Sequence, residues 1–184
     1  MKIVIASVPG AALGFLLSDW LQENLFRPQV VALALIAGGI VFIVVERWRG
    51  KVPGDDRLDQ PISIRQSIGI GAFQVLALIP GMSRSGMSIL GALLLGVPRA
   101  TATRFSFYLA LPILGGATVY TLLKNLNAIQ NDDLLLLFFG ALISAIVAWF
   151  SIAWLLRYVA RNSFIPFGVY RIVLGVVILL LGLS

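Results

Sequence analysis

Long apolar runs alternate with short polar segments along the whole chain. The runs occupy residues 3–17, 30–45, 105–123, 134–156 and 172–183. They lack the two-residue period of a half-buried strand, and a helix needs about 20 mostly apolar residues to cross a bilayer. The pattern predicts an all-α polytopic membrane protein with about five transmembrane helices, folded as one domain over residues 1–184.

Composition strengthens this prediction and removes several chemistries. Hydrophobic residues make up 59% of the chain and charged residues 12%, against about 25% charged residues in soluble domains. The chain has no cysteine and no histidine, which excludes disulfides, thiolate metal sites and an imidazole base. The net charge of +6 does not indicate nucleic acid, because Lys and Arg mark the cytoplasmic loops of membrane proteins. We therefore expect the membrane as a partner and no nucleic acid.

Two further apolar runs, at residues 68–79 and 89–97, are too short to cross and flank the segment PGMSRSG. As helices they reach about 18 Å and about 14 Å, whereas the hydrocarbon core is about 30 Å thick. The lengths predict a re-entrant helix-loop-helix over residues 66–97, which enters and leaves the membrane on one side.

The distribution of basic residues supports the hairpin. With the N-terminal end in the cytoplasm and a hairpin that returns, every Lys and Arg except Arg27, Lys124 and Arg84 lies on the cytoplasmic side. This is the positive-inside bias of membrane proteins, and it disappears if the segment crosses once. It predicts a cytoplasmic loop at residues 46–65 and an outside C-terminus. Two full crossings would give the same charge pattern, and only the short lengths favour the hairpin.

Arg84 stands at the tip of this hairpin, where a charge costs roughly 3 kcal/mol or more in lipid. Its guanidinium offers five donors in a fork that matches phosphate or carboxylate oxygens. The alternative is a structural ion pair with a carboxylate. All eight acidic residues fall in or beside predicted loops, which favours a bound anion over the ion pair.

The residues around Arg84 suit the same ligand. Pro80 and Gly81 end the first half-helix, and Ser85 is predicted to cap the second, whose free N–H groups form a positive end. Hydroxyl groups come from Ser83, Ser85 and Ser88.

Two glycines and one amide complete the predicted set. Gly81 and Gly86 let a ligand approach the backbone closely. Gln74, on the entering half-helix, is a further candidate binding residue, with burial against a neighbouring helix as the alternative.

The segment AFQVLALIPGMSRSGMSILGALLLGVPRATATRFSFYLALPILGG resembles the second signature of the undecaprenyl-pyrophosphate phosphatase, or bacitracin-resistance, family. The flanking VIASVPGAALGF and NSFIPFGVYRIVLG are also similar to it. The resemblance implies an inner-membrane hydrolase that removes the terminal phosphate of undecaprenyl pyrophosphate and so recycles a cell-wall lipid carrier. It implies catalytic roles for Ser83, Arg84 and Ser88, with Ser at a position where the family often has Thr. Many members carry Glu where this chain has Arg104.

The family's first signature, an EGxTEFLPxSSTGH-like segment in an inverted-repeat partner hairpin, has no counterpart in this sequence. We therefore expect the chain to match the C-terminal two-thirds of the family: one half of an inverted repeat plus flanking helices. The chain alone is expected to be inactive. The resemblance also suggests Mg²⁺ as a cofactor, although no metal-ligand set is evident. A homodimer is left open.

Two other functions compete with the phosphatase. Half-helices that meet near the midplane also form the anion sites of secondary transporters, so a transporter or flippase for an anionic lipid or a small anion is the alternative. A non-catalytic membrane remnant is the third hypothesis.

Overall fold

The computed structural model describes residues 1–50, 55–56, 60–125 and 131–182 of the chain. These parts form helices and turns without strands, which confirms the all-α prediction. The helices are α1 (Lys2–Leu16), α2 (Ser18–Leu25), α3 (Pro28–Arg49), α4 (Ile64–Val75), the 3₁₀ turn η1 (Leu76–Leu78), α5 (Arg84–Leu94), α6 (Arg99–Lys124), α7 (Asn131–Arg161) and α8 (Ile165–Gly182).

The helices confirm a polytopic membrane protein. Within the described residues, α3, α6, α7 and α8 are long and apolar enough to cross a membrane. The pair α1 and α2, bent by 71°, makes up to five crossings if it counts as one span. Large apolar side chains are exposed along α7 and the second half of α6, as expected for a surface that faces lipid.

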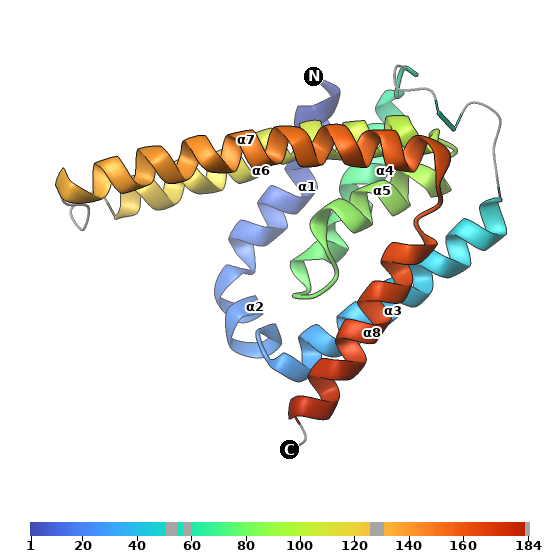
Figure 1. The fold of residues 1–184 in the computed structure, drawn as a ribbon, viewed down its shortest axis with the longest axis horizontal. Coiled ribbons are helices and arrows are strands. Elements are labelled where there is room, and N and C mark those ends of the chain that lie inside the picture. Colours follow the sequence, from blue (N-terminus) through green and yellow to red (C-terminus); the bar gives the residue numbers. More distant parts are fainter. Residues whose placement is uncertain (51–54, 57–59, 126–130, 183–184) are drawn as a thin grey trace.

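Figure 1 shows how the elements surround the short helices α4 and α5. Helices α3 and α8 pack side by side, as do α6 and α7. The α4–α5 hairpin lies between α1 on one side and the α3–α8 pair on the other, with α6 along α5. The turn at residues 79–83 thus lies among these helices, partly buried, with Ser83 exposed. Whether this hairpin enters and leaves the membrane on one side stays a prediction.

Several predicted loops are helical. The polar stretch at residues 18–29 contains α2, and the basic segment PRATATR forms the first turns of α6. Likewise α3 continues to Arg49, and most of residues 157–171 belongs to α7 and α8. Hydropathy locates the apolar centre of a helix, whereas the backbone hydrogen bonds continue through polar residues at its ends. For this reason the helix ends predicted from the apolar runs were wrong.

Local sequence signals explain where the hairpin helices begin and end. The Ser63 hydroxyl accepts from the N–H of Gln66, and the Gln66 side chain accepts from the N–H of Ser63, a capping box that starts α4. Helix α5 ends before Gly96, whose φ of +76° is left-handed, and Pro98 then occupies the position directly before α6.

Backbone contacts at glycine hold the two helix pairs together. A Cβ on Gly39 of α3 would lie 2.6 Å from the carbonyl oxygen of Gly168 in α8, and one on Gly71 of α4 would lie 2.7 Å from that of Ala6 in α1. Such close approach lets membrane helices associate through packing, without a hydrophobic driving force. The packing fixes the α3–α8 pair and the α1–α4 pair as the two walls beside the hairpin.

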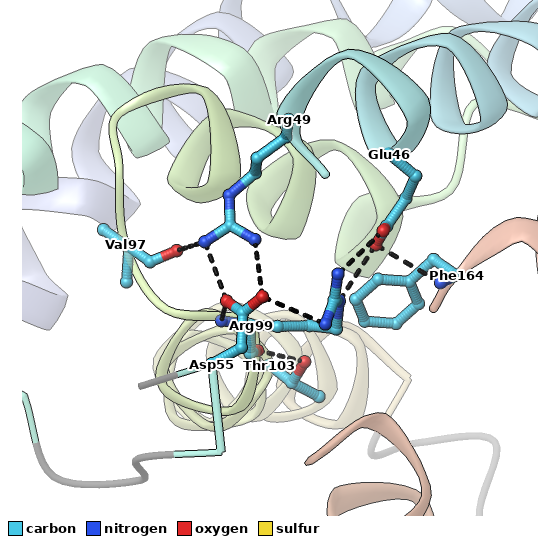
Figure 2. Close-up of polar contacts among 7 residues, drawn as sticks. All are labelled: Glu46, Arg49, Asp55, Val97, Arg99, Thr103 and Phe164. Atoms are coloured by element: carbon cyan, nitrogen blue, oxygen red, sulfur yellow. Dashed lines mark hydrogen bonds and ion pairs between the residues drawn. The ribbon is translucent and has the colours of Figure 1, made fainter. Parts of the chain in front are cut away.

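A buried ion network joins helix ends that are far apart in the sequence (Figure 2). The guanidinium of Arg99 contacts Glu46 of α3 at 2.9 Å and Asp55 at 3.1 Å. Glu46 also accepts the backbone N–H of Phe164 before α8, and Asp55 pairs with Arg49 at 2.8 Å. Glu46, predicted at a loop edge, is buried inside α3 with 4% exposure. Its partner is Arg99 and not Arg84, so the network leaves the tip cation without a carboxylate.

We predict that Glu46→Ala destabilises the protein strongly, because it leaves Arg99 buried with an incomplete set of partners. Removal of one member of a buried ion pair costs about 3–5 kcal/mol. Thermal unfolding in detergent should show a clearly lower midpoint for Glu46→Ala. The control is Arg47→Ala, one residue along α3, where the side chain is exposed and the described residues provide no ion pair. Equal midpoints for the two variants would contradict the prediction.

Candidate functional site

The hairpin turn has an unusual backbone. Gly81 has a φ of +99° and Ser83 a φ of +68°. Among the residues that the structure describes, Ser83 is the one residue other than glycine with a positive φ. Helix α5 begins directly afterwards, at Arg84. Ser83 and not Ser85 is therefore the N-cap, so the predicted cap was wrong by two residues. The left-handed Ser83 turns the chain sharply into the helix.

The two serines at this helix start lie close together. The Ser83 hydroxyl oxygen accepts a hydrogen bond from the N–H of Gly86 at 3.2 Å, and it lies 3.4 Å from the Ser85 hydroxyl oxygen. The first turn of any helix carries N–H groups without intrahelical acceptors and a partial positive charge. The start of α5 thus offers hydroxyls and N–H groups to an anion.

Ser83, Ser85 and Gly86 open onto a cavity of about 370 Å³. Its other walls are apolar and aromatic, apart from one cation, Arg171. The residues in these walls are Leu35, Phe42, Ile89, Leu155, Phe164, Phe167, Tyr170 and Arg171. Polar groups at one end of an apolar cavity suit a ligand with an anionic head and a hydrocarbon chain.

Arg84 points to the opposite side of the helix start. Its Nη1 donates to the carbonyl oxygen of Ser106 in α6 at 2.9 Å, and it does not line the cavity of Ser83 and Ser85. This contact occupies one of the five guanidinium N–H groups. No carboxylate pairs with Arg84 in the part of the chain that the structure describes. The cation is held by a carbonyl and keeps donors for a ligand.

The remaining predicted residues lie apart from the cavity. Ser88 is 1% exposed between α5 and α6, where its hydroxyl lies 2.7 Å from that of Ser106. Gln74 is 3% exposed and faces α1, where a Cβ on Gly10 would lie 3.0 Å from its amide nitrogen. Gly81 packs its Cα against the backbone of α3. The structure therefore brings Ser83, Ser85 and Gly86 to one cavity and places Arg84, Ser88, Gln74 and Gly81 around it.

Two residues missed in the sequence contact this turn. Ser106 of α6 touches both Arg84 and Ser88, as described above. Arg171 falls just before the predicted apolar run 172–183 and was expected on the cytoplasmic side, but it lies inside α8 with 8% exposure and donates to the carbonyl oxygens of Gly81 and Met82. A signal existed for Arg171, since it is followed by the uninterrupted apolar run IVLGVVILLLGL.

The donor set does not fit a resident divalent cation. In the described ranges, no three Asp, Glu, His or Cys side chains come together, and the cavity is lined by hydroxyls without a carboxylate. Mg²⁺ binds proteins through one or two carboxylates, usually together with phosphate oxygens of the substrate. The suggested Mg²⁺ therefore has no ligand set here.

The described residues of this site offer hydrogen-bond donors and positive charge, but no base that could activate a nucleophile. A helix N-terminus, two hydroxyls and the cations Arg84 and Arg171 meet at one turn. A serine hydroxyl needs an adjacent base to become nucleophilic, and no Asp, Glu or Lys lines the cavity.

Fold and site together define a polytopic α-helical membrane protein whose turn between two short helices carries hydroxyl and N–H donors. Comparison with known proteins identifies the family. Residues 1–177 match the family described as bacitracin resistance protein BacA, and the chain belongs to it. It is 46% identical over 182 residues to the undecaprenyl-diphosphatase of Deinococcus radiodurans and 44% identical over 186 residues to that of Lactobacillus delbrueckii subsp. bulgaricus. The undecaprenyl-diphosphatase of Enterococcus faecalis is 42% identical over 180 residues.

Coverage is unequal on the two sides of these comparisons. The matches include 98%, 99% and 98% of this chain, but 66%, 67% and 65% of the three relatives. The chain thus spans about two thirds of the length of its curated relatives. The family match begins at residue 1, and the predicted absence of the first family signature is not confirmed.

We predict that Ser83→Gly is more stable than Ser83→Ala. Both variants lose the hydroxyl cap, which costs about 1 kcal/mol for alanine and only a few tenths of a kcal/mol for glycine. Alanine keeps the steric cost of a left-handed residue, about 1–2 kcal/mol, whereas glycine adopts φ +68° freely. Thermal unfolding in detergent measures the difference. Ser63→Ala serves as the matched control, because it removes the cap of α4 at a φ of −74°. If Ser83→Ala matches Ser83→Gly in stability, the backbone argument is wrong.

Proposed function

We propose that this chain forms the diphosphate-binding part of an undecaprenyl-diphosphate phosphatase. The reaction is hydrolysis: undecaprenyl diphosphate and water give undecaprenyl phosphate and inorganic phosphate, with cleavage of the bond between the terminal phosphorus and the bridging oxygen. The reaction is supported by relatives 40–46% identical to this chain, which are undecaprenyl-diphosphatases. The location of the diphosphate site is supported by the N-terminus of α5, which opens on an apolar cavity.

The geometry suits the two ends of this substrate. The phosphates lie at the N–H groups and hydroxyls of Ser83 and Ser85, where the helix end favours negative charge. The first prenyl units occupy the apolar part of the cavity, between Phe42 and Phe167. A longer chain leaves the cavity for the lipid, since the exposed surface of the helices is apolar.

Arg84 is proposed to bind the phosphate that leaves. Its contact with the Ser106 carbonyl fixes the guanidinium against α6, and its other N–H groups are the donors that we propose for the phosphate oxygens. Preorganised donors of this kind stabilise the charge that develops in the transition state. Ser88, held by Ser106, supports the helix turn that carries Arg84.

We predict that Arg84→Ala lowers phosphate release by about 100-fold or more, the usual effect of removing one such donor. Arg84→Lys should also lose most activity, because an ammonium does not reproduce the planar fork. The assay uses a fusion that supplies the third of the Deinococcus radiodurans relative that this chain leaves uncovered, in nanodiscs with undecaprenyl diphosphate.

Arg65→Lys, on the exposed start of α4, is the matched control and should keep full activity. Full turnover of Arg84→Lys would show that only a point charge is required. Movement of the lipid or of a small anion across the membrane without phosphate release would favour the transporter alternative.

We also propose that the protein lies in the bacterial inner membrane with the N-terminal end of this chain in the cytoplasm and the C-terminal end outside. In Figure 1 the N-terminal end and the open end of the hairpin lie toward the upper side of the view, and the C-terminal end lies at the bottom. The re-entrant course of residues 66–97 and the cytoplasmic position of residues 46–65 belong to the same proposal. A homodimer stays a prediction.

Cysteine labelling tests this orientation, because the chain has no cysteine of its own. We expect Arg47→Cys to react with an impermeant maleimide from the cytoplasmic side and Lys124→Cys from the outside. Both side chains are exposed at helix ends. Residue 127, between Lys124 and α7 in the sequence, would be a probe of the same side but lies outside the described residues. Reaction of Lys124→Cys from the cytoplasm alone would overturn the orientation.

A further inference from the structure

Arg171 is a buried cation that reaches the hairpin turn from another helix. It is 8% exposed on α8, close to ninety residues away from the turn in sequence. Its Nη2 donates to the carbonyl oxygen of Gly81 at 2.9 Å, and its Nη1 to that of Met82 at 3.0 Å. Two parallel hydrogen bonds from one guanidinium to successive carbonyls fix the direction of that peptide segment.

The segment needs such support. Gly81 and Ser83, on either side of Met82, both have positive φ, and Ser83 pays a steric cost for it. A strained non-glycine residue persists only when the surrounding structure holds it. The Arg171 contacts act at the residues directly before Ser83, and Ser83 caps the helix whose N–H groups face the cavity.

Neighbouring residues are shaped to admit the guanidinium. A Cβ on Gly38 of α3 would collide with Nη2 of Arg171, so the missing side chain provides the space for it. A Cβ on Gly81 would likewise collide with the carbonyl oxygen of Val31, which presses the turn against α3. The guanidinium therefore lies enclosed between α3 and the turn.

We propose that Arg171 is a positioning residue: it holds the 79–83 turn in the left-handed conformation that directs the start of α5 into the cavity. It acts through the backbone of Gly81 and Met82 and not through the reacting phosphate. The effect on ligand affinity rests on the proposed function, whereas the effect on the turn does not.

Amide hydrogen exchange on the 184-residue chain in nanodiscs tests the effect on the turn. The N–H groups of Gly86 and Met87 bond to Ser83, at its hydroxyl and its carbonyl oxygen, so they report on the turn. Arg171→Met should speed their exchange about tenfold or more, the effect expected for loss of charge-assisted hydrogen bonds. Arg171→Lys should give an intermediate rate, because one ammonium does not span both carbonyls.

Gly38→Ala provides a second variant that keeps the arginine. Its methyl group displaces the flexible end of Arg171 and should speed the same amides. In the double variant with Arg171→Met the two effects should not add, because the methyl group then has no guanidinium to displace. Gly115→Ala on α6, where a Cβ meets nothing within 4 Å, is the control and should match the wild type.

The outcomes separate the possibilities. Rates within twofold of the wild type in both Arg171→Met and Gly38→Ala would overturn the proposal. An equal rise of exchange throughout α3 and α8 would also overturn it, since it would show a general role in stability. If Arg171→Met does not fold, Gly38→Ala decides alone.

Binding of undecaprenyl diphosphate, measured on the same samples, addresses the proposed function. We expect Arg171→Met to weaken binding about tenfold, in line with the loss of turn order. Absence of binding by the wild type would count against the proposed function and would leave the exchange result intact. Unchanged affinity in Arg171→Met, with a wild type that binds, would overturn the positioning role.

Discussion

The buried position of Arg99 between Glu46 and Asp55 determines how the rest of the molecule is arranged. A charge that leaves water must find partners in the interior, and these partners come from the end of α3 and from the segment after it. The same Glu46 accepts the N–H of Phe164, just before α8. One carboxylate therefore fixes the starts of α6 and α8 against the end of α3. In a membrane, where apolar helices gain little by touching one another, such specific contacts decide which helices are neighbours.

The geometry of the turn at residues 79–83 depends on this arrangement of helices. The network fixes the starts of α6 and α8, and each of these helices contributes one residue that contacts the hairpin. Ser106 of α6 contacts Arg84, and Arg171 of α8 contacts Gly81 and Met82. The hairpin itself contributes hydroxyls and a helix end, but two flanking helices set their direction. This division explains why the predicted residues do not all face one cavity. Consecutive residues at a helix start point in different directions, so Arg84 faces α6 while Ser83 and Ser85 face the α3–α8 side.

Much of the fold follows from local sequence, and the parts that do not share a cause. Apolar runs revealed the long helices, and the shortness of residues 68–79 and 89–97 revealed the hairpin with its turn at Pro80. The burial of Glu46, the helical setting of Arg171 and the contact of Ser106 depend on pairings across many residues, which hydropathy does not register. Because charged residues usually lie at membrane edges, the sequence predicts Arg171 at the cytoplasmic side and not inside a helix. The cap was misplaced because a left-handed Ser83 contradicts the backbone preference of serine.

The left-handed Ser83 also has a thermodynamic consequence for recognition. If α3 and α8 hold the turn in one conformation, as proposed for Arg171, its conformational entropy is lost during folding and not when a ligand arrives. Ordering a loop on binding subtracts from affinity, and a turn that is ordered beforehand avoids that subtraction. Rigidity also sharpens discrimination, since donors fixed in place accept an anion whose oxygens match their spacing and do not adjust to one that differs. A small, strained turn can in this way be selective without any large movement of the surrounding helices.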